Sequence, residues 1–415
     1  VYPLSQHIGA PAVCLVKKGD HVLAGQKIAE AGGFVSAPVF ASVSGTVKAI
    51  EPRHVATGDL VNSIIIENDG EMKETDFHGV EDVASLSKEQ IIEKVKEAGV
   101  VGMGGAGFPT HVKLSPKEPD KIEFIIANCA ECEPLLRLHR QLLEKYAKEI
   151  IDTFHMIGET VGAKEVIIGI KKAYTATIEA VKAVMGQYPE VRLGLLDEVY
   201  PAGDEVVLIY ETTGKVVRPG GLPIESGVAV FNVETVYNVY RALNEKTPVE
   251  DKLVSVVAEV EHPITVRVPI GTPLEEVVAL AGGVTTKDAV YFVGGPMMGN
   301  TQYTTQAAST KGTSGILCLS EEKARIPEPT ACLRCGRCTE VCPAFLQPLY
   351  ISANSLKGDF DRAEEHRALD CIECGSCSFI CPARRPLVES IRNAKRQIQA
   401  KRRKAQAEAK AKAAK

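Results

Sequence analysis

Eight of the twelve cysteines in this 415-residue chain lie in one stretch, and that stretch limits most strongly what the chain can fold into. They form two repeats of the pattern C-x₂-C-x₂-C-x₃-C-P, Cys332–Pro343 and Cys371–Pro382. In a secreted protein such clustering would indicate disulfides, but in a cytosolic chain it more often indicates metal ligands. The start, Val1–Gly9, lacks the layout of a signal peptide, and no run of 18 or more apolar residues occurs. We therefore expect a cytoplasmic protein that binds metal.

The spacing of both repeats is typical of proteins that hold two [4Fe–4S] clusters. A cubane cluster needs four thiolates in a tetrahedral arrangement, and a tight loop with a cysteine at every third position wraps three of its corners. Gly336 and Gly375 allow backbone amides to approach the sulfides, and Pro343 and Pro382 redirect the chain after each loop. The fourth cysteine of each loop lies beyond a helical turn and reaches the other cluster. The predicted ligands are Cys332, Cys335, Cys338 and Cys381 for one cluster, and Cys371, Cys374, Cys377 and Cys342 for the other.

Structural zinc and disulfides are the alternatives to clusters. Zinc sites usually combine two separate C-x₂-C pairs, whereas here three evenly spaced cysteines are followed by a Cys-Pro step, which favours clusters. Because the two loops exchange ligands, the clusters should be neighbours. Such a pair relays single electrons and does no substrate chemistry alone, so another part of the chain must supply it with electrons.

Charge and composition exclude some functions. The net charge of −5, the absence of Trp and an aromatic content of 5% argue against a nucleic-acid partner. The end of the chain, residues 393–415, is a run rich in Lys, Arg and Ala. This run favours a solvated helix, and the alternative is a basic contact with a partner subunit or an anionic lipid.

The patterns along the chain predict an α/β multidomain protein. Residues 1–75, with short strands and Gly-Asp and Ser-Gly turns, resemble the β barrel-sandwich hybrid of biotinyl and lipoyl carriers, without the context of the carrier lysine. Residues 76–245 alternate strands and helices, which implies an α/β domain with a mainly parallel sheet. Residues 246–318 resemble a soluble-ligand-binding β-grasp module. A C-terminal α-helical, ferredoxin-like two-cluster domain spans 319–392, and the basic tail spans 393–415.

A glycine-rich loop, Gly102–Gly107, is the first feature outside the cysteine repeats that points to a ligand. Consecutive glycines expose backbone N–H groups and make an anion-binding nest, and Lys113 lies near enough in sequence to neutralise a phosphate. A plain tight turn explains such a loop as well. It is not a Walker A loop, because no Gly-Lys-Ser/Thr follows.

Four segments in the same order resemble the NADH-oxidising subunit of respiratory complex I. They are Gly104–Thr110, Asn128–Pro134, Gly203–Glu205 and Asn232–Thr235. In that family these segments surround FMN and the nicotinamide of NADH. The resemblance therefore implies that this chain binds FMN and NADH.

The whole layout resembles the RnfC family, the peripheral subunit of the Rnf electron-transport complex. The matching segments outside the cysteine repeats are Pro3–Pro11, Gly102–Lys113, Pro219–Pro223 and Gly294–Gly299. The family also has soluble branches, the cobalamin reductase of propanediol microcompartments and the electron-transfer protein associated with proline reductase. The segment Tyr200–Glu205 is similar in sequence to these soluble branches.

The resemblance implies roles for individual residues. Glu131 and Glu133 would be the catalytic acids, facing the isoalloxazine and the nicotinamide beside Asn128. Lys113, Asn232 and Thr235 would bind the phosphate or ribityl oxygens of FMN, and Phe108 would stack on NADH. The implied cofactor-binding set is Gly102, Gly104, Gly105, Gly107, Phe108, Lys113, Asn128, Glu205, Asn232 and Thr235.

Simpler interpretations stay open for several of these segments. A solvated loop would account for Glu131 and Glu133, and turns would account for Asn232 and Gly294–Gly299.

The remaining cysteines have structural interpretations. Cys129 and Cys132 form a C-x₂-C that is either a redox pair or a variation within the family. Cys14 and Cys318 are most simply core residues.

The sequence thus predicts an NADH-oxidising oxidoreductase of anoxic metabolism that passes single electrons through FMN and two [4Fe–4S] clusters to a redox partner. Membrane Rnf subunits are one possible partner, with the chain peripheral on the inner face of the cell membrane. The alternatives are a soluble donor to a corrinoid enzyme or proline reductase, and a ferredoxin-like relay without flavin.

Overall fold

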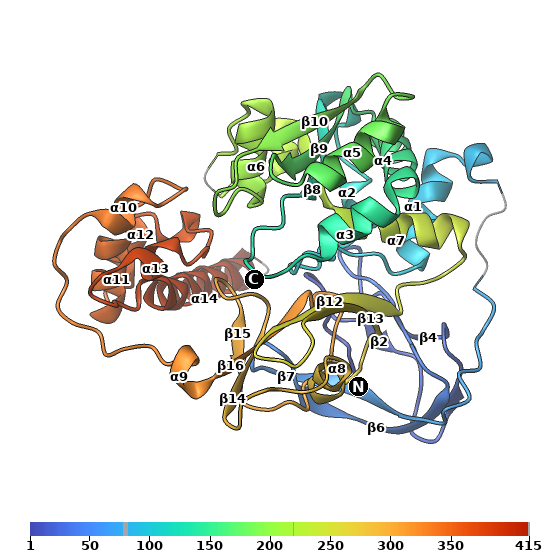
Figure 1. Ribbon diagram of the computed structural model, residues 1–415, viewed down its shortest axis with the longest axis horizontal. Coiled ribbons are helices and arrows are strands. Elements are labelled where there is room, and N and C mark those ends of the chain that lie inside the picture. The colour runs from blue at the N-terminus through green and yellow to red at the C-terminus, as the bar shows by residue number, and fades with distance from the viewer. Residues whose placement is uncertain (78–81, 219, 414–415) are drawn as a thin grey trace. The chain divides into compact units, whose positions relative to one another are not determined.

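The computed structural model describes residues 1–77, 82–218 and 220–413 (Figure 1). The chain forms two units, one of Val1–Val217 with Pro223–Lys323 and one of Arg218–Leu222 with Ala324–Lys415. Pro219, the first residue of the predicted Pro219–Pro223 segment, lies outside the described residues.

The N-terminal part of the first unit is all β, as predicted. One antiparallel sheet has the order β1-β7-β6-β3 and a smaller one the order β2-β4-β5. Buried apolar side chains such as Val22, Ile28 and Ile64 fill the space between the strands. The strands are β1 (Tyr2–Pro3), β2 (Val13–Cys14), β3 (His21–Val22), β4 (Lys27–Glu30), β5 (Val39–Phe40), β6 (Gly45–His54) and β7 (Leu60–Asn68).

The central part is an α/β layer built on a parallel sheet of order β10-β9-β8-β11. Its two central strands contain runs of Ile and Val that are mostly buried, which is the pattern that a helix-covered parallel sheet requires. The strands are β8 (Phe124–Cys129), β9 (Glu165–Lys171), β10 (Val191–Leu196) and β11 (Val228–Asn232). The helices are α1 (Lys88–Glu97), α2 (Thr110–Lys113), α3 (Leu138–Lys145), α4 (Ala147–Val161), α5 (Thr175–Met185), α6 (Glu205–Thr213) and α7 (Val233–Asn244), with 3₁₀ turns η1 (Val83–Ser85), η2 (Pro119–Lys121) and η3 (Pro223–Ser226).

The β-rich part that follows is a mixed sheet of order β13-β12-β16-β14-β15. Leu274, Val277 and Val278 of α8 (Leu274–Leu280) are buried in the same apolar cluster as the inner residues of this sheet. The strands are β12 (Asp251–Ala258), β13 (Ile264–Pro269), β14 (Ala289–Val293), β15 (Asn300–Gln302) and β16 (Gly315–Ser320).

The second unit is helical and follows the short helix α9 (Glu321–Ala324). Its small core combines Leu346 and Ile351 with Ile391 and Ile398 of the last helix. That helix, α14, runs from Leu387 to Ala413 and crosses the boundary that the sequence analysis placed at residue 393. Its elements are α10 (Arg337–Glu340), α11 (Pro348–Leu356), α12 (Phe360–Glu365), η4 (Ala368–Asp370), α13 (Ser376–Ile380) and α14. Among the described residues, none of the helices combines the length and the apolar character needed to span a bilayer.

Candidate functional site

The parallel sheet has a switch point between β8 and β11. From β8 the chain winds outward through β9 to β10, and it then returns to place β11 on the other side of β8. Open α/β sheets bind ligands outside the carboxyl ends of their strands at such a point. Asn128 and Asn232, which end or nearly end these two strands, are register partners there. Two segments that the resemblance to the complex I subunit selected together therefore meet at the sheet end where such a fold is expected to form a ligand-binding crevice.

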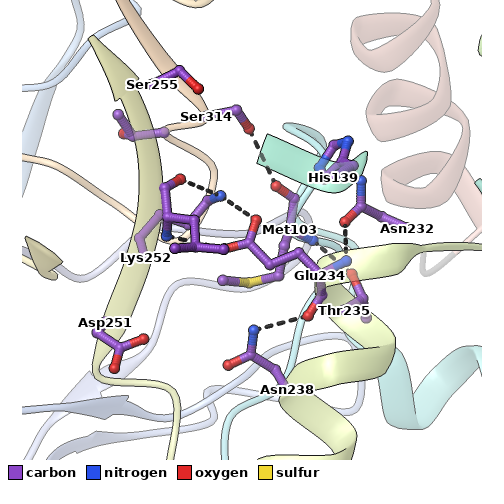
Figure 2. A network of polar contacts seen from close by, with 12 residues as sticks. Met103, His139, Asn232, Glu234, Thr235, Asn238, Asp251, Lys252, Ser255 and Ser314 are labelled. Atoms are coloured by element: carbon purple, nitrogen blue, oxygen red, sulfur yellow. Dashed lines mark hydrogen bonds and ion pairs between the residues drawn. The ribbon is translucent and has the colours of Figure 1, made fainter. Parts of the chain in front are cut away.

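Asn232 begins helix α7 and fixes a histidine (Figure 2). Its Oδ1 accepts a hydrogen bond from the Glu234 amide at 2.9 Å, so its Nδ2 is the group that faces His139 Nε2 at 3.0 Å. Nδ2 is a donor, hence Nε2 of His139 must be an unprotonated acceptor. Burial lowers the pKa of His139 to about 3, which agrees with a neutral ring. His139 was not predicted from the sequence, because no local motif marks it.

The glycine-rich loop is held against α7. The Met103 amide donates to Thr235 Oγ1 at 2.9 Å, and Ser314 Oγ donates to the Met103 carbonyl at 3.4 Å (Figure 2). A Cβ added to Gly104 would lie 3.0 Å from Asn232 Nδ2, so a side chain at this position would displace the loop or the asparagine. Gly104, Gly105 and Ala106 are exposed. The loop thus presents its backbone to solvent at the switch point while its base is fixed.

A second loop backs the glycine-rich loop. A Cβ on Gly312 would lie 3.0 Å from the Gly105 carbonyl oxygen, so the two backbones are in close approach. The neighbouring Lys311 is fully buried, and its Nζ donates to the carbonyls of Pro38 at 2.8 Å and Gly99 at 2.7 Å. Burial lowers the pKa of Lys311 to about 7. Lys311 therefore ties the second loop to the N-terminal sheets and to the end of α1.

Lys113 lies at the same end of the sheet. Its Nζ donates to the Val230 carbonyl at 2.7 Å, lies 3.7 Å from Glu205 Oε1 and sits 6.0 Å from the centre of the Phe108 ring. Burial lowers the pKa of Lys113, and the nearby Glu205 partly opposes that effect. The structure thus brings Phe108, Lys113 and Glu205 together, as expected for residues that shape one pocket.

The two predicted catalytic acids point to different neighbours. Glu131 is buried and accepts hydrogen bonds from the amides of His139 at 2.8 Å and Arg140 at 3.4 Å, so it caps the start of α3. Burial raises the pKa of Glu131 to about 7. Glu133 instead accepts from the Met297 amide at 3.0 Å, inside the predicted Gly294–Gly299 segment. Burial also raises the pKa of Glu133. The geometry therefore joins Glu131 to the His139–Asn232 pair and joins Glu133 to the β-rich part.

The C-x₂-C outside the cluster loops has a structural role. Cys132 Sγ accepts from the Gly203 amide at 2.6 Å, and Asn128 Nδ2 donates to the Gly203 carbonyl at 2.8 Å. Neither Cys129 nor Cys132 forms a disulfide. Burial raises the pKa of Cys132 to about 11 and that of Cys129 well above its ordinary value, which makes reactive thiolates scarce. These contacts favour a structural pair over a redox pair.

The chemical groups at the switch point suit a phosphorylated flavin. They are exposed loop amides at a position where a side chain would clash, a half-buried lysine, and the N-terminus of the twelve-residue helix α7. The residues that would hold the group are those of the glycine-rich loop with Lys113, Asn232 and Thr235. A separate cavity, lined by residues of η1, α1, α4 and α7, includes none of the predicted site residues among its described lining.

The cysteine loops of the second unit line two cavities of similar size. Their turns have matching backbones: Arg334 and Glu373 have φ of 52° and 59°, and Gly336 and Gly375 both have φ of 80°. The cysteines that line the first cavity are Cys332, Cys335, Cys338 and Cys381, and those that line the second are Cys342, Cys371, Cys374 and Cys377.

These cavities suit clusters better than single ions. A zinc ion needs its sulfur ligands at about 2.3 Å from the metal, which draws them tightly together. In the part of the chain that the structure describes, no three His, Cys, Asp or Glu side chains gather closely enough to hold one ion. Each set of four cysteines instead surrounds a space, and each set takes its fourth member from the other loop.

Comparison with known families divides the chain into four matching regions. The regions match the RnfC barrel sandwich hybrid domain over residues 1–71, the Nuo51 FMN-binding domain over 95–241, the SLBB domain over 253–301 and the 4Fe-4S dicluster domain over 325–401.

Two curated relatives are similar over nearly the whole chain, and both are subunits of ferredoxin:NAD(+) oxidoreductase complexes. The one from the Na(+)-translocating complex of Acetobacterium woodii is 42% identical, over 97% of this chain and 92% of the relative. The one from the proton-translocating complex of Clostridium ljungdahlii is 38% identical, over 94% of this chain and 86% of the relative.

Among solved structures, a chain of an NAD+-reducing [NiFe]-hydrogenase in its H2-reduced state has a similar fold. The TM-score is 0.51 at 20% identity, over 77% of this chain and 62% of the hydrogenase chain. The chain therefore spans less than two thirds of that structure, and the likeness concerns the fold alone.

The fold and the domains define an electron-transfer flavoprotein with an FMN-binding domain and two [4Fe–4S] clusters. The chain belongs to the RnfC family. The predicted family, the four-part fold class and the predicted cofactors are confirmed.

Proposed function

We propose that this protein oxidises NADH through FMN and passes the electrons one at a time, through its two [4Fe–4S] clusters, to a partner protein. The observation that carries the proposal is that Asn128 and Asn232 meet at the switch point of a chain that also has two cysteine-lined cavities. When bound, FMN supplies the step between a two-electron hydride donor and one-electron carriers. The chain's own residues must bind the flavin, orient the nucleotide against it and exclude water.

The contacts support distinct roles for the crevice residues. Gly104 keeps the loop close to Asn232, and Thr235 fixes the loop through the Met103 amide. Lys113 supplies a positive charge for a phosphate. Glu131 orients His139 by capping α3, and Asn232 holds the His139 ring in its neutral form. In this proposal Glu133 positions the Gly294–Gly299 segment, because its carboxylate binds the Met297 amide.

The partner follows from the family. The relatives are named as subunits of complexes that couple ferredoxin and NAD⁺, and we infer that this chain docks on other Rnf subunits at the inner face of the membrane. Residues 401–409 of α14 are exposed; Lys401 and Arg402 there pair with Asp361 and Glu364, and Arg403 and Lys404 support contact with a partner or an anionic surface. The second candidate for the acceptor is a soluble corrinoid enzyme or amino-acid reductase. The sequence of Tyr200–Glu205 favours it.

Anaerobically purified protein tests the function directly. We expect flavin absorbance, about eight irons per chain from two cubanes, and bleaching on addition of NADH. Iron without flavin and without a response to NADH would mean that the protein is only an electron relay. Zinc in place of iron would overturn the electron-carrier function altogether. Capture of membrane Rnf subunits, set against capture of a soluble enzyme, then identifies the acceptor.

A further inference from the structure

The two cluster cavities differ in their access to solvent. In the first set, Cys332 and Cys335 are exposed. In the second set, Cys374 and Cys377 are buried, with 9% and 8% of their surface exposed. A cluster in the first cavity would therefore sit closer to water than a cluster in the second.

The charges that line the two cavities differ as well. Three arginines and no acidic residue line the first cavity, whereas no charged residue lines the second. In the described part of the chain, none of the three takes part in an ion pair, and Arg385 only donates to the Thr330 carbonyl at 3.4 Å. Glu340 is the acid closest in sequence to these arginines, in the exposed helix α10. The three arginines are Arg334, Arg337 and Arg385.

Charges just outside the second cavity partly cancel. Lys395 donates to the Cys371 carbonyl at 2.6 Å, but its Nζ is also 2.6 Å from Glu373. Arg392 pairs with the same Glu373 at 3.1 Å. One carboxylate is thus shared by two cations, which leaves a smaller local field than three arginines without acidic partners.

Hydrogen bonds to the cysteine sulfurs occur in both sets and reach more cysteines in the second. In the second set, amides donate to Cys342 and Cys371, both at 3.4 Å. In the first set, Cys338 interacts with the Leu349 backbone and the Thr339 side chain. Hydrogen bonds to sulfur raise the potential of a cluster and favour the second set, whereas solvent exposure and nearby positive charge favour the first.

We propose that the two clusters have different reduction potentials, and that the cluster held by Cys332, Cys335, Cys338 and Cys381 has the higher one. Each cluster takes up one electron, which adds one negative charge. Water and nearby cations stabilise that charge, and an apolar shell disfavours it. Arg334 and Arg337 are then the residues that tune the first cluster. The proposal rests on the proposed function for the presence of both clusters.

The difference assigns a direction to the relay. When the two clusters together hold one electron, that electron resides on the first cluster. Two cysteine ligands of that cluster are exposed. The first cluster is therefore the one from which a redox partner collects the electron, and the second is the internal one.

A potentiometric titration of the holoprotein with dithionite, followed by the paramagnetic signal of the reduced clusters, tests the proposal. We expect two one-electron steps. In the variant Arg334→Gln/Arg337→Gln the higher step moves to lower potential and the lower step stays in place. Added salt should bring the two reduction potentials of the wild type closer together, because the screening length falls to about 3 Å at 1 M. The variant Cys335→Ser, which alters one ligand of the first cluster, should change the signal of the higher step.

Arg403→Gln is the matched control. Arg403 is exposed on α14, 16 residues beyond the cavity-lining Leu387, which is about 24 Å along a helix. This change should move neither step. The proposal is overturned by one unresolved two-electron step, by a shift of the lower step in the double arginine variant, or by assignment of the higher step to the second cluster. Failure of the proposed function looks different, because the protein would then lack flavin or a response to NADH, or iron analysis would find fewer than about eight irons per chain.

Discussion

The cluster loops and the flavin crevice are built in opposite ways. Each cluster cavity draws its cysteines from two short loops whose spacing is visible in the sequence. The crevice joins the glycine-rich loop, the ends of β8 and β11, the start of α3 and the Ser314 loop, which are far apart along the chain. A site encoded by local spacing can be recognised from one sequence, whereas a site encoded by topology needs the strand order. The following experiments test how far this contrast holds.

The largest expected effect concerns the exchange of ligands between the two cluster loops. If the fourth cysteines are exchanged, Cys332→Ala/Cys381→Ala removes two ligands of one cluster and lowers the iron from about eight to about four per chain. Cys338→Ala/Cys342→Ala, within one loop, damages both clusters and leaves almost no iron. Iron and sulfide analysis measures both variants. If each loop held its own cluster, the two results would be reversed, and flavin content serves as the folding control.

The next effect concerns a buried ion pair that holds the crevice. Lys252 on β12 is fully buried and pairs with Glu234 of α7, whose Oε1 also accepts from the Leu253 amide at 3.0 Å (Figure 2). Lys252→Met leaves a buried carboxylate without its cation and should lower the free energy of unfolding by about 3–5 kcal/mol. Glu234→Leu/Lys252→Met removes both charges and should recover most of that loss.

Urea unfolding, followed by release of flavin, measures this pair. Because the protein has more than one unit, the transition of the flavin-binding part must be followed by itself. Equal losses in the single and double variants would mean that packing, and not the charge pair, stabilises this junction. In that case the charge pair with Lys252 would not explain the place of Glu234 in the Asn232–Thr235 segment.

The sequence predicted the parts of this molecule whose signals are local. The cysteine spacing and the alternating strands and helices indicated the cluster domain and the parallel sheet. The crevice residues came only from the family resemblance, and their roles stay predictions. His139 and Lys311 were missed, because nothing near them in the sequence signals that His139 meets Asn232 or that Lys311 reaches Pro38 and Gly99. The separation of Glu133 from Glu131 was also missed, since two acids so close in sequence were expected to face one ligand.

A smaller effect follows from the burial of Glu131. Its pKa is about 7 in the folded protein and near 4.5 in the unfolded chain. Between these values the folded state keeps a proton that the unfolded state releases, so stability falls as the pH rises from about 4.5 to 7. The loss amounts to at most about 3 kcal/mol. Glu131→Gln should remove this slope, and urea midpoints between pH 5 and 8 measure it. Glu179→Gln, at an exposed position on α5, should keep the wild-type slope. A wild-type stability that rises with pH while Glu131→Gln leaves the curve unchanged would contradict the buried, protonated carboxyl.

The smallest effect tests whether the glycine-rich loop is a binding site or a plain turn. Gly104→Ala places a methyl group 3.0 Å from Asn232 Nδ2 and should weaken FMN binding about tenfold, or about 1.4 kcal/mol, by pushing the loop away from α7. Gly186→Ala, in a helix-like conformation with no atom within 4 Å of the added Cβ, is the matched control and should bind FMN normally. Titration of flavin-free protein with FMN, followed by quenching of flavin fluorescence, gives both affinities. Equal affinities would show that the approach of Gly104 to Asn232 does not shape the flavin pocket. The flavin site would then be supported only by the family resemblance, whereas the cluster loops are supported by their own cysteine spacing.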